Sequence, residues 1–593
     1  MQTPRRLLAL FLTSLLIAAA CGTDDAGDNP LDDSSQGNLD ADPGDCLVVD
    51  MAVSSEKIEL LTDLAGEFNN TGAEVNGECV FVRVQKKASG GAEQLLEKGW
   101  DESVEGPRPV VWSPASSAWA AVLNQRLSQQ GEPAMATEVT PFMLTPVVIA
   151  MPEPMAEALG YPDTPIGFTD ILDLARSEQG WAEFGHPEWG SFRLGKTNPN
   201  LSTTGLSLED LARPEVVDFG TGVESAVVHY GDTTLTFLNN WYEADQRGNP
   251  FAYVSAVAIE EKSMIDYNTG NPDGILDQGE EPRPPRIPLV AIYPKEGTLF
   301  SDNPFIILDA EWVDENQKQG ARLFQDFVQK PENQERVLEF GFRPGNSEVA
   351  VGAPIVAANG VDPTQPATLL DVPSPEVAVE ILDLWEEQRK TARVDLVIDV
   401  SGSMGEFAVP GGNETKLDLA KRAAIEALDQ FGDDDEVGLR IFTTDLDADG
   451  AEFLDLVQVE RVGDVREALK REISQLVPLN GTPLYSVTQA SFDASLATFD
   501  PTRINAVVLL TDGVNEDGDS ADDRQQLDDL LGSLRANSAS ETGDPVRVFA
   551  IGYGEGADFA VLSDIASASN GAVYDASDPA SISKVFAEVI SNF

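Results

Sequence analysis

The sequence predicts an α/β protein built from two successive regions of alternating strands and helices. Short apolar strands alternate with helical patterns over residues 46–387, and the same alternation returns over residues 392–593. This order of elements is typical of sheets whose parallel strands are joined by crossover helices. The 593 residues are 42% hydrophobic, which is enough apolar material for sizeable cores. We therefore expect a folded α/β body over most of the chain.

The charge balance excludes several classes of function. The chain has 39 Lys and Arg against 101 Asp and Glu, a net charge of −62. Because phosphate binding needs a basic surface, this balance argues against a nucleic-acid partner, and an anionic membrane surface would also repel the protein. Two His and three Cys argue against a histidine-based catalytic network or a Cys-rich zinc site. Chemistry is therefore expected mainly from oxygen ligands.

Residues 1–20 have the pattern of a secretion signal. Arg5 and Arg6 precede an apolar run that ends in small residues directly before Cys21. The run is too short for a permanent transmembrane helix. It resembles the bacterial lipobox, in which the Cys becomes the new N-terminus and carries lipid; an ordinary signal peptide with an incidental Cys is the alternative. We expect lipidation of Cys21 and a protein held by its lipid on the outside of the bacterial cell membrane.

Residues 21–45 predict a disordered acidic tether, and the folded body is expected to begin at Cys46. The segment from Gly22 to Asp45 holds eight Asp and no Lys or Arg, so it cannot bury enough apolar surface to order itself. Cys46 and Cys79 then flank one strand-helix-strand pattern. Since an oxidising compartment permits disulfides and no partner for a reactive thiol is evident, we expect these two residues to form one.

Several phrases in residues 46–387 carry a family resemblance. These are "VWSPASSAWA" (111–120), "TPVVIAMP" (145–152), "GKTNPNLSTTGLS" (195–207), "YPKEGTLFSDNPF" (293–305) and "FGFRPGN" (340–346). They resemble the type II periplasmic solute-binding proteins. The resemblance implies two lobes, crossovers near Pro146–Met151 and Ala291–Pro294, and a ligand in the cleft between the lobes.

Three hydroxyl-rich turns are candidates for lining that cleft. Each follows a strand or opens a helix, and Ser54, Ser116 and Thr204 are the individual candidates. Backbone N–H groups at helix starts suit a small anion or polar solute. A hydroxyl in such a position is also a common helix cap, which is the alternative interpretation. The residues do not identify the solute.

"GSFRLGKT" (190–197) satisfies a nucleotide-loop pattern, but its context does not. A phosphate loop follows a buried strand and opens directly into a helix, whereas Asn198-Pro199-Asn200 follows here. Because Pro199 moves Asn198 away from helical geometry, we assign no nucleotide site and expect Lys196 at the surface.

Residues 269–280 match part of an EF-hand calcium loop. Positions three, five, seven, nine and twelve of that loop fall on Asn271, Asp273, Ile275, Asp277 and Glu280, with Gly274 at position six. Thr269 stands where the first carboxylate is expected, and no flanking helix pair is evident. We keep a structural Ca²⁺ site and a plain solvated insertion as alternatives.

The sharpest pattern lies in the last third of the chain. The apolar strand in "RVDLVIDVSGS" (393–403) delivers Asp399, Ser401 and Ser403 onto the loop at its end. Two further loops, expected at the same sheet edge, hold Thr482 in "NGTPLY" (480–485) and Asp512 in "LLTDGVN" (509–515). All five side chains offer the hard oxygen donors that Mg²⁺ prefers, with Ca²⁺ or Mn²⁺ as alternatives. The alternative to metal binding is that Asp399 and the serines merely cap a turn.

Residues 392–593 resemble the von Willebrand factor A (VWA) family, whose doubly wound, Rossmann-like domain carries a metal-ion-dependent adhesion site (MIDAS) of Asp-x-Ser-x-Ser, a distant Thr and a distant Asp. Together with the preceding module, the chain resembles the extracellular "substrate-binding and VWA domain" lipoproteins. The resemblance makes Asp399, Ser401, Ser403, Thr482 and Asp512 the metal ligands. It also implies an open coordination position for an acidic residue of a partner protein.

We expect a binding protein and not an enzyme. The only His residues, His186 and His229, lie outside this third of the chain, and an acidic surface loop explains Asp445, Asp447 and Asp449 as well as a general base does. The leading hypothesis is a cell-surface protein that binds a partner protein through the metal while the solute-binding-like module captures or senses a ligand. The alternative is the substrate-binding component of an ABC-type transport system. A role beside a cytosolic AAA+ ATPase conflicts with the secretion signal.

Overall fold

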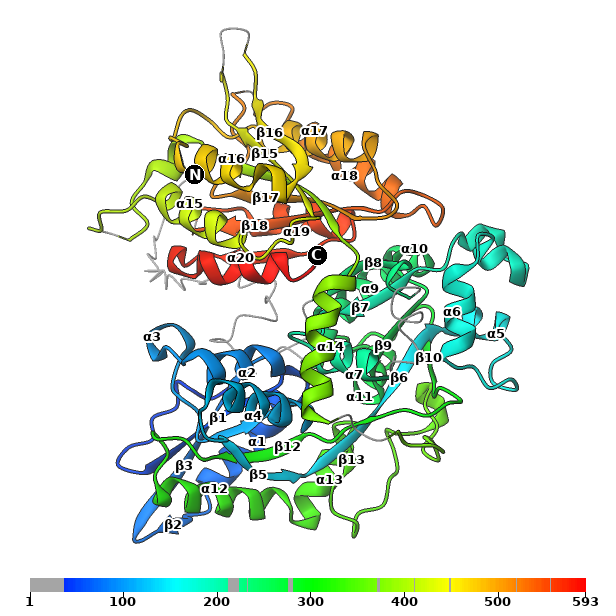
Figure 1. Cartoon of the computed structure of the whole chain (residues 1–593), viewed down its shortest axis with the longest axis vertical. Coiled ribbons are helices and arrows are strands. Elements are labelled where there is room, and N and C mark those ends of the chain that lie inside the picture. The colour runs from blue at the N-terminus through cyan, green and yellow to red at the C-terminus, as the bar shows by residue number, and fades with distance from the viewer. Residues whose placement is uncertain are drawn as a thin grey trace, which may run out of the picture.

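The computed structural model describes residues 37–593 except 212–222, 232, 276–280, 371–373, 410, 447–449, 519 and 555. It contains three sheets in three bodies (Figure 1). Two bodies form the lobes of the first module, and the third is the carboxy-terminal α/β domain. Cys21 and the rest of residues 1–36 lie outside the described residues, as do Asp277 and Glu280 of the candidate calcium loop.

Lobe 1 is built on a six-stranded sheet of order β2-β3-β1-β4-β12-β5. β1 runs parallel to β3 and β4, whereas β12 is antiparallel to its neighbours. The central strands are buried on both faces, which matches their nearly continuous apolar sequence. The strands are β1 (Leu47–Val53), β2 (Glu74–Val75), β3 (Glu78–Lys86), β4 (Val111–Ser113), β5 (Ala136–Pro141) and β12 (Pro304–Leu308). The helices include α1 (Ile58–Asn69), α2 (Ser89–Lys98), α3 (Glu102–Glu105), α4 (Ala118–Gln130), α12 (Glu315–Val328) and α13 (Pro331–Glu339).

Lobe 2 is built on a second sheet of order β10-β6-β9-β7-β8. The long strand β6 pairs with β13 and β11 near its start and with β9 and β10 further on. Its first residue packs in the core of lobe 1 and its later residues pack in lobe 2, so the strand passes from one lobe into the other. The strands are β6 (Met143–Pro152), β7 (Leu194–Thr197), β8 (Val227–Gly231), β9 (Ala256–Glu260), β10 (Leu289–Ile292), β11 (Phe300–Ser301) and β13 (Arg343–Pro344). The helices include α5 (Glu153–Ala158), α6 (Phe168–Arg176), α7 (Thr203–Leu211), α9 (Thr234–Arg247), α10 (Pro250–Tyr253) and α11 (Glu261–Thr269).

The carboxy-terminal domain is a six-stranded sheet of order β16-β15-β14-β17-β18-β19. All neighbours are parallel except the edge strand β16, which is antiparallel to β15. Helices α15, α16 and α20 pack on one face, and α17, α18 and α19 on the other. The strands are β14 (Ala392–Asp399), β15 (Glu436–Phe442), β16 (Phe453–Arg461), β17 (Ile504–Thr511), β18 (Val546–Tyr553) and β19 (Val573–Ala576). The helices are α15 (Lys416–Ala427), α16 (Val462–Ser474), α17 (Leu484–Ala497), α18 (Asp523–Ser538), α19 (Phe559–Ala568) and α20 (Ile582–Ile590).

Helix α14 (Pro375–Gln388) leads from the two-lobed module into this domain, which lies against lobe 2 (Figure 1). One hydrophobic cluster runs without interruption from lobe 2 through Trp385 into the sheet of the carboxy-terminal domain. The buried Arg193 of lobe 2 donates to the backbone oxygens of Ser540 (3.3 Å), Glu541 (2.8 Å) and Gly543 (3.0 Å). Lobe 2 and the carboxy-terminal domain therefore share one core and one set of hydrogen bonds.

The end of the chain also contacts lobe 2. The Asn198 side chain donates to the Ser591 carbonyl at 3.0 Å, and the Tyr230 N–H donates to the Asn592 carbonyl at 3.3 Å. Asn198 directly follows β7 and accepts from the N–H groups of Leu201 and Ser202, in the turn that opens α7. The two residues that follow α20 are thus hydrogen-bonded to the turn after β7 and to β8 of the solute-binding module.

Two predictions about the amino-terminal part have different outcomes. The disulfide between Cys46 and Cys79 is confirmed, with an S–S distance of 2.03 Å. The prediction that the tether is free as far as residue 45 is wrong for its last part. Gly37 bridges to Gln85, and the Asn38 amide bonds the backbone of Val82 and Val84 at 3.1 and 2.6 Å. These bonds hold Gly37 and Asn38 against β3.

The prediction that Lys196 is a surface residue is also wrong. Lys196 lies in β7 with 2% of its surface exposed, forms an ion pair with Glu224, and places its ammonium 5.6 Å from the ring centre of Trp385. The paired carboxylate and the aromatic ring offset the cost of burying the charge. The "GKT" segment is therefore a strand and not a loop that opens a helix.

Within the described ranges, no helix combines the length and apolar character needed to cross a bilayer.

Candidate metal site and solute cleft

The structure brings the five predicted metal ligands together at the carboxyl ends of β14 and β17. Asp399 is the last residue of β14, and Asp512 follows β17, the neighbouring parallel strand. Ser401 directly precedes the short helical turn η6 (Gly402–Gly405), and Ser403 lies within it. Thr482 precedes α17. Because parallel strands end at one edge of a sheet, segments more than 100 residues apart in sequence meet here.

A continuous chain of hydrogen bonds links four of these side chains. Asp399 Oδ1 accepts from the Ser401 N–H at 2.7 Å, and the hydroxyls of Ser401 and Ser403 lie 2.9 Å apart. The Ser403 hydroxyl donates to Asp512 Oδ1 at 2.7 Å. The oxygens are therefore held close together by the backbone turn and by one another.

Thr482 joins the cluster through a backbone pairing. Its N–H donates to the Glu516 carbonyl at 3.0 Å, and the Glu516 N–H donates back to the Thr482 carbonyl at 2.7 Å. A Cβ placed on Gly513 would lie 3.5 Å from Thr482 Oγ1 and 3.9 Å from Ser403 Oγ. Both hydroxyl oxygens thus lie beside Gly513, and the loop after Asp512 is fixed to the Thr482 loop.

Burial makes the ionised form of the Asp399 carboxyl unfavourable when no cation is bound. The residue is fully buried, and this desolvation raises the pKa of its carboxyl from 3.8 to about 7. Donation from the Thr511 hydroxyl at 2.6 Å and from Ser401 favours the charged form, whereas the charge of nearby Asp512 disfavours it. A bound cation would stabilise both carboxylates.

Two residues of the site were not predicted from the sequence. Lys416, the first residue of α15, places its ammonium 2.8 Å from Asp512 Oδ2 and 3.4 Å from Glu406 Oε2. Thr511 orients Asp399. A single Lys at a helix start carries no motif, so only the fold reveals its contact with Asp512. Thr511 directly precedes Asp512 at the end of an apolar strand. This position next to a predicted ligand was the sequence signal that could have identified Thr511.

The donor set fits a hard divalent cation. Two carboxylates and three hydroxyls, all oxygen donors, match the preference of Mg²⁺, Ca²⁺ or Mn²⁺, and Cys and His are absent from the five residues. If a divalent cation binds, the carboxylates of Asp399 and Asp512 would balance its two charges, and Ser401, Ser403 and Thr482 would supply neutral oxygen ligands.

A strongly acidic hollow of about 560 Å³ adjoins this site. It is lined by five carboxylates, those of Asp445, Glu452, Glu516, Asp517 and Asp523. The hollow begins at Gly481 and Asn515, which neighbour Thr482 and the loop after Asp512. One oxygen each from Asp517, Asp522 and Asp523 falls within 4.8 Å of the others. Asp447 and Asp449, named above as general-base candidates, lie outside the described residues.

The two lobes of the first module enclose a small polar cavity of about 40 Å³. Lobe 1 contributes Ser54, Ser55, Glu56 and Ser89, and lobe 2 contributes Ser202, Thr203, Thr233, Thr234, Glu260 and Ser263. The lobes are in contact beside it, because the Gly90 N–H donates to the Leu201 carbonyl at 3.0 Å and Trp119 Nε1 donates to Thr203 Oγ1 at 2.8 Å. This is a closed cleft.

Four helices begin at the cavity wall: α2, α7, α9 and α11. Free N–H groups and the positive ends of helix dipoles favour negative charge at such a point. Burial, together with the charge of Glu56, raises the pKa of the Glu260 carboxyl to about 8. The wall therefore combines hydroxyls and helix starts, which can donate to an anionic or polar solute, with the side chains of Glu56 and Glu260.

Buried Lys57 supports the floor of the cleft. Its ammonium contacts Ser54 Oγ (2.6 Å), Asn303 Oδ1 (2.7 Å) and the Pro114 carbonyl (3.0 Å). Burial lowers the pKa of Lys57. The three contacts join the turn after β1 to the turns before α4 and β12, and so fix the cleft face of lobe 1.

The three predicted cleft residues occupy different positions. Ser54 lines the cavity. Thr204 is buried, and its hydroxyl lies 2.9–3.1 Å from the hydroxyls of Thr197, Ser202 and Thr234, so it braces the residues that line the wall. Ser116 accepts from the Ala118 N–H at 3.2 Å at the start of α4. The role of each in solute binding stays a prediction.

The candidate calcium loop is described only in part. Thr269 ends α11, and its hydroxyl donates to the carbonyls of Ile265 and Asp266. Asp273 accepts from the Ile275 N–H at 3.1 Å, and Asn271 Oδ1 is buried. These contacts form a turn after the helix, and calcium binding there stays a prediction.

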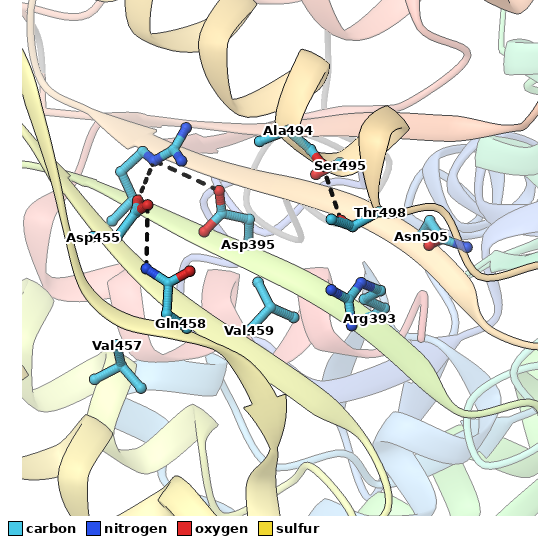
Figure 2. A pocket seen from close by; sticks show the side chains of 11 residues that line it. Arg393, Asp395, Asp455, Val457, Gln458, Val459, Ala494, Ser495, Thr498 and Asn505 are labelled. Atoms are coloured by element: carbon cyan, nitrogen blue, oxygen red, sulfur yellow. Dashed lines mark hydrogen bonds and ion pairs between the residues drawn. The ribbon is translucent and has the colours of Figure 1, made fainter.

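A second polar cavity of about 140 Å³ lies near the opposite end of β14 (Figure 2). Asp395 and Arg440 face each other there, 3.9 Å apart, and Arg440 also contacts Asp455 at 2.7 Å. Burial raises the pKa of the Asp395 carboxyl to about 6. Asp395 precedes Asp399 by four residues in the same strand, so this cavity is separate from the metal ligands.

Comparisons with known families agree with this two-part architecture. Residues 49–343 match the family model of bacterial extracellular solute-binding proteins, and residues 394–588 match that of the von Willebrand factor type A domain. The protein therefore combines an extracellular solute-binding domain with a following VWA domain, both of them binding-type domains. No curated protein matches the sequence at a significant level.

Among solved structures, the similarities are to the separate parts. The periplasmic binding protein AfuA from Actinobacillus pleuropneumoniae, with fructose-6-phosphate bound, is 14% identical, covering 58% of this chain and 99% of its own at a TM-score of 0.40. A VWA protein from Catenulispora acidiphila is 23% identical over 34% of this chain and 42% of its own, with a TM-score of 0.26. Proximal thread matrix protein 1 from the mussel byssus, with a zinc-occupied MIDAS motif, is 19% identical over 34% and 47%, with a TM-score of 0.26.

We predict that Mg²⁺ affinity rises with pH. Below about pH 7 the Asp399 carboxyl is protonated, so the cation must displace a proton, and affinity should fall by up to tenfold per pH unit. Above that range the dependence should flatten. Calorimetric Mg²⁺ titrations from about pH 6 to about pH 8 measure this. A constant affinity across the range would show that Asp399 does not bind the cation as a carboxylate.

We predict that Gly90→Ala prevents full closure of the cleft. A Cβ at Gly90 would lie 2.0 Å from the Asn200 carbonyl oxygen of the other lobe, whereas a Cβ at Gly91 would meet nothing closer than 3.6 Å. Gly90→Ala should therefore expand the full-length protein in small-angle X-ray scattering. Gly91→Ala, in the same helix, is the control and should keep the parent profile. Identical profiles for both variants would contradict the closed contact.

Proposed function

We propose that the protein is a lipid-anchored, extracytoplasmic binding protein whose VWA domain binds a partner protein through a divalent cation. The supporting observation is the cluster of Asp399, Ser401, Ser403 and Asp512, linked by direct hydrogen bonds at the sheet edge, with Thr482 beside it. Mg²⁺ is the proposed cation, with Ca²⁺ or Mn²⁺ as alternatives. An acidic side chain of the partner would complete the coordination.

The solute-binding module would capture or sense a small polar solute, with an anion favoured. Four helix starts and a wall of hydroxyls support this class of ligand. The second candidate function, the substrate-binding component of an ABC-type transporter, rests on the same cleft. A permease encoded beside this gene would favour transport, and an isolated gene would favour the surface receptor.

The metal site is tested by Asp399→Asn. This nearly isosteric change removes the charge that the cation needs, so Mg²⁺ binding should weaken by at least about 100-fold, and EDTA should no longer alter the melting temperature. Asp395→Asn is the matched control, since Asp395 is also buried in β14 but lies four residues from Asp399. Calorimetry and thermal melts measure both. Unchanged Mg²⁺ binding in Asp399→Asn would refute the proposed site.

The lipid anchor is tested by Cys21→Ser. If Cys21 carries the lipid, the wild-type protein should fractionate with membranes and the variant should appear in the soluble extracytoplasmic fraction. Mass spectrometry of the mature amino terminus supplies an independent readout. A wild-type terminus at another residue, without lipid mass, would exclude the anchor.

A further inference from the structure

Exposed apolar side chains surround the candidate metal site. Among the described residues of the VWA domain, seven large apolar side chains are strongly exposed, and five of them stand on the three loops that carry the metal ligands. These five form what we call the apolar rim: Phe407 (60% exposed), Val409 (56%), Val477 (59%), Leu479 (45%) and Val514 (45%).

The rim is attached directly to the ligand loops. The Leu479 N–H donates to the Val400 carbonyl at 2.7 Å, between Asp399 and Ser401. A Cβ on Gly405 would lie 2.8 Å from Pro478 Cγ, so the Val477–Leu479 segment packs beside the η6 turn. Val514 follows Gly513, beside which the Ser403 and Thr482 hydroxyls lie. Val477, Leu479 and Val514 therefore lie beside the metal ligands, and Phe407 and Val409 follow the η6 turn in the same loop.

The apolar rim serves no packing purpose that the described part of the chain shows. In a protein of net charge −62, five such side chains on one sheet edge leave apolar surface in water around a charged site. Exposed apolar surface gathered at one place, with a polar border, is typical of protein-binding sites.

The acidic hollow favours a partner side chain of positive charge. It begins beside Thr482, is lined by five carboxylates, and has no Lys or Arg among its described lining residues. A partner with a basic side chain would find complementary charge there, whereas a second acidic side chain would be repelled. A metal bound beside Thr482 would attract a carboxylate, whereas the neighbouring hollow attracts a basic group. A partner must therefore present charges of opposite sign at two adjacent positions.

We infer that the partner is a protein whose binding segment places one Asp or Glu at the metal, a large apolar residue against the rim, and a Lys or Arg toward the hollow. This inference rests on the proposed metal-dependent function and specifies its partner. The carboxylate supplies the metal dependence, the apolar residue supplies buried area, and the basic residue fixes the orientation of the segment.

The probe is a constrained random peptide library displayed on phage, selected on the immobilised full-length protein in Mg²⁺ and eluted with EDTA. The selected sequences should share an acidic residue flanked by a large apolar residue on one side and a basic residue on the other. A synthetic consensus peptide then serves for affinity measurements on the wild type and its variants.

Variants separate the rim from the metal. Leu479→Ser should weaken the consensus peptide about tenfold or more while Mg²⁺ binding, measured by calorimetry, stays unchanged. Leu369→Ser is the matched control, because Leu369 is also exposed (57%) but lies in the solute-binding module. Asp517→Lys should weaken the consensus peptide and restore binding of a peptide whose basic residue is replaced by Glu.

The outcomes test the inferred partner chemistry separately from the proposed metal-dependent binding. If Leu479→Ser and Asp517→Lys bind the peptide like the wild type while EDTA still releases it, the inferred partner chemistry is overturned and the metal site stands. If EDTA elutes no enriched sequence from the immobilised protein, metal-dependent protein binding itself is overturned. Loss of binding in the rim variant with the control unaffected supports the inference.

Discussion

The burial of the Asp399 carboxylate at the end of β14 is the constraint on which the VWA face depends. β14 lies centrally in its sheet, between β15 and β17, and it ends by placing a carboxylate where water does not reach. A buried charge must be paired, hydrogen-bonded or neutralised. Thr511, Ser401 and the chain of hydroxyls leading to Asp512 meet part of that need, and a divalent cation would meet the rest.

Burial of charged groups also determines the chemistry of the solute cleft. There burial raises the pKa of Glu260 and lowers the pKa of Lys57. Hydroxyls and helix starts line the cleft beside Glu56, whereas carboxylates gather at the VWA edge. Under the proposed function, the two faces would recognise different classes of ligand.

Much of this could be predicted from the sequence because it is local. The apolar strand before Asp399, the hydroxyls at fixed spacing and the loops of Thr482 and Asp512 each follow a short-range pattern, and the parallel sheet brings them together. The edge strand β16 was not among the expected strands, since it is largely exposed and lacks a continuous apolar run. The burial of Lys196 could not be predicted from the sequence, because its partners Glu224 and Trp385 are distant along the chain. Lys416 carries no motif, so its contact with Asp512 required the fold.

The shared core between lobe 2 and the VWA domain has a mechanical consequence. Gly37 and Asn38 are bonded to β3 of lobe 1, whereas the VWA domain shares its core with lobe 2. If the cleft opens by a hinge motion, the VWA domain would rotate with lobe 2, and the packing of α14 in the core of lobe 1 would have to change. Under the proposed function, solute occupancy would then set the orientation of the metal-site edge relative to the lipid anchor.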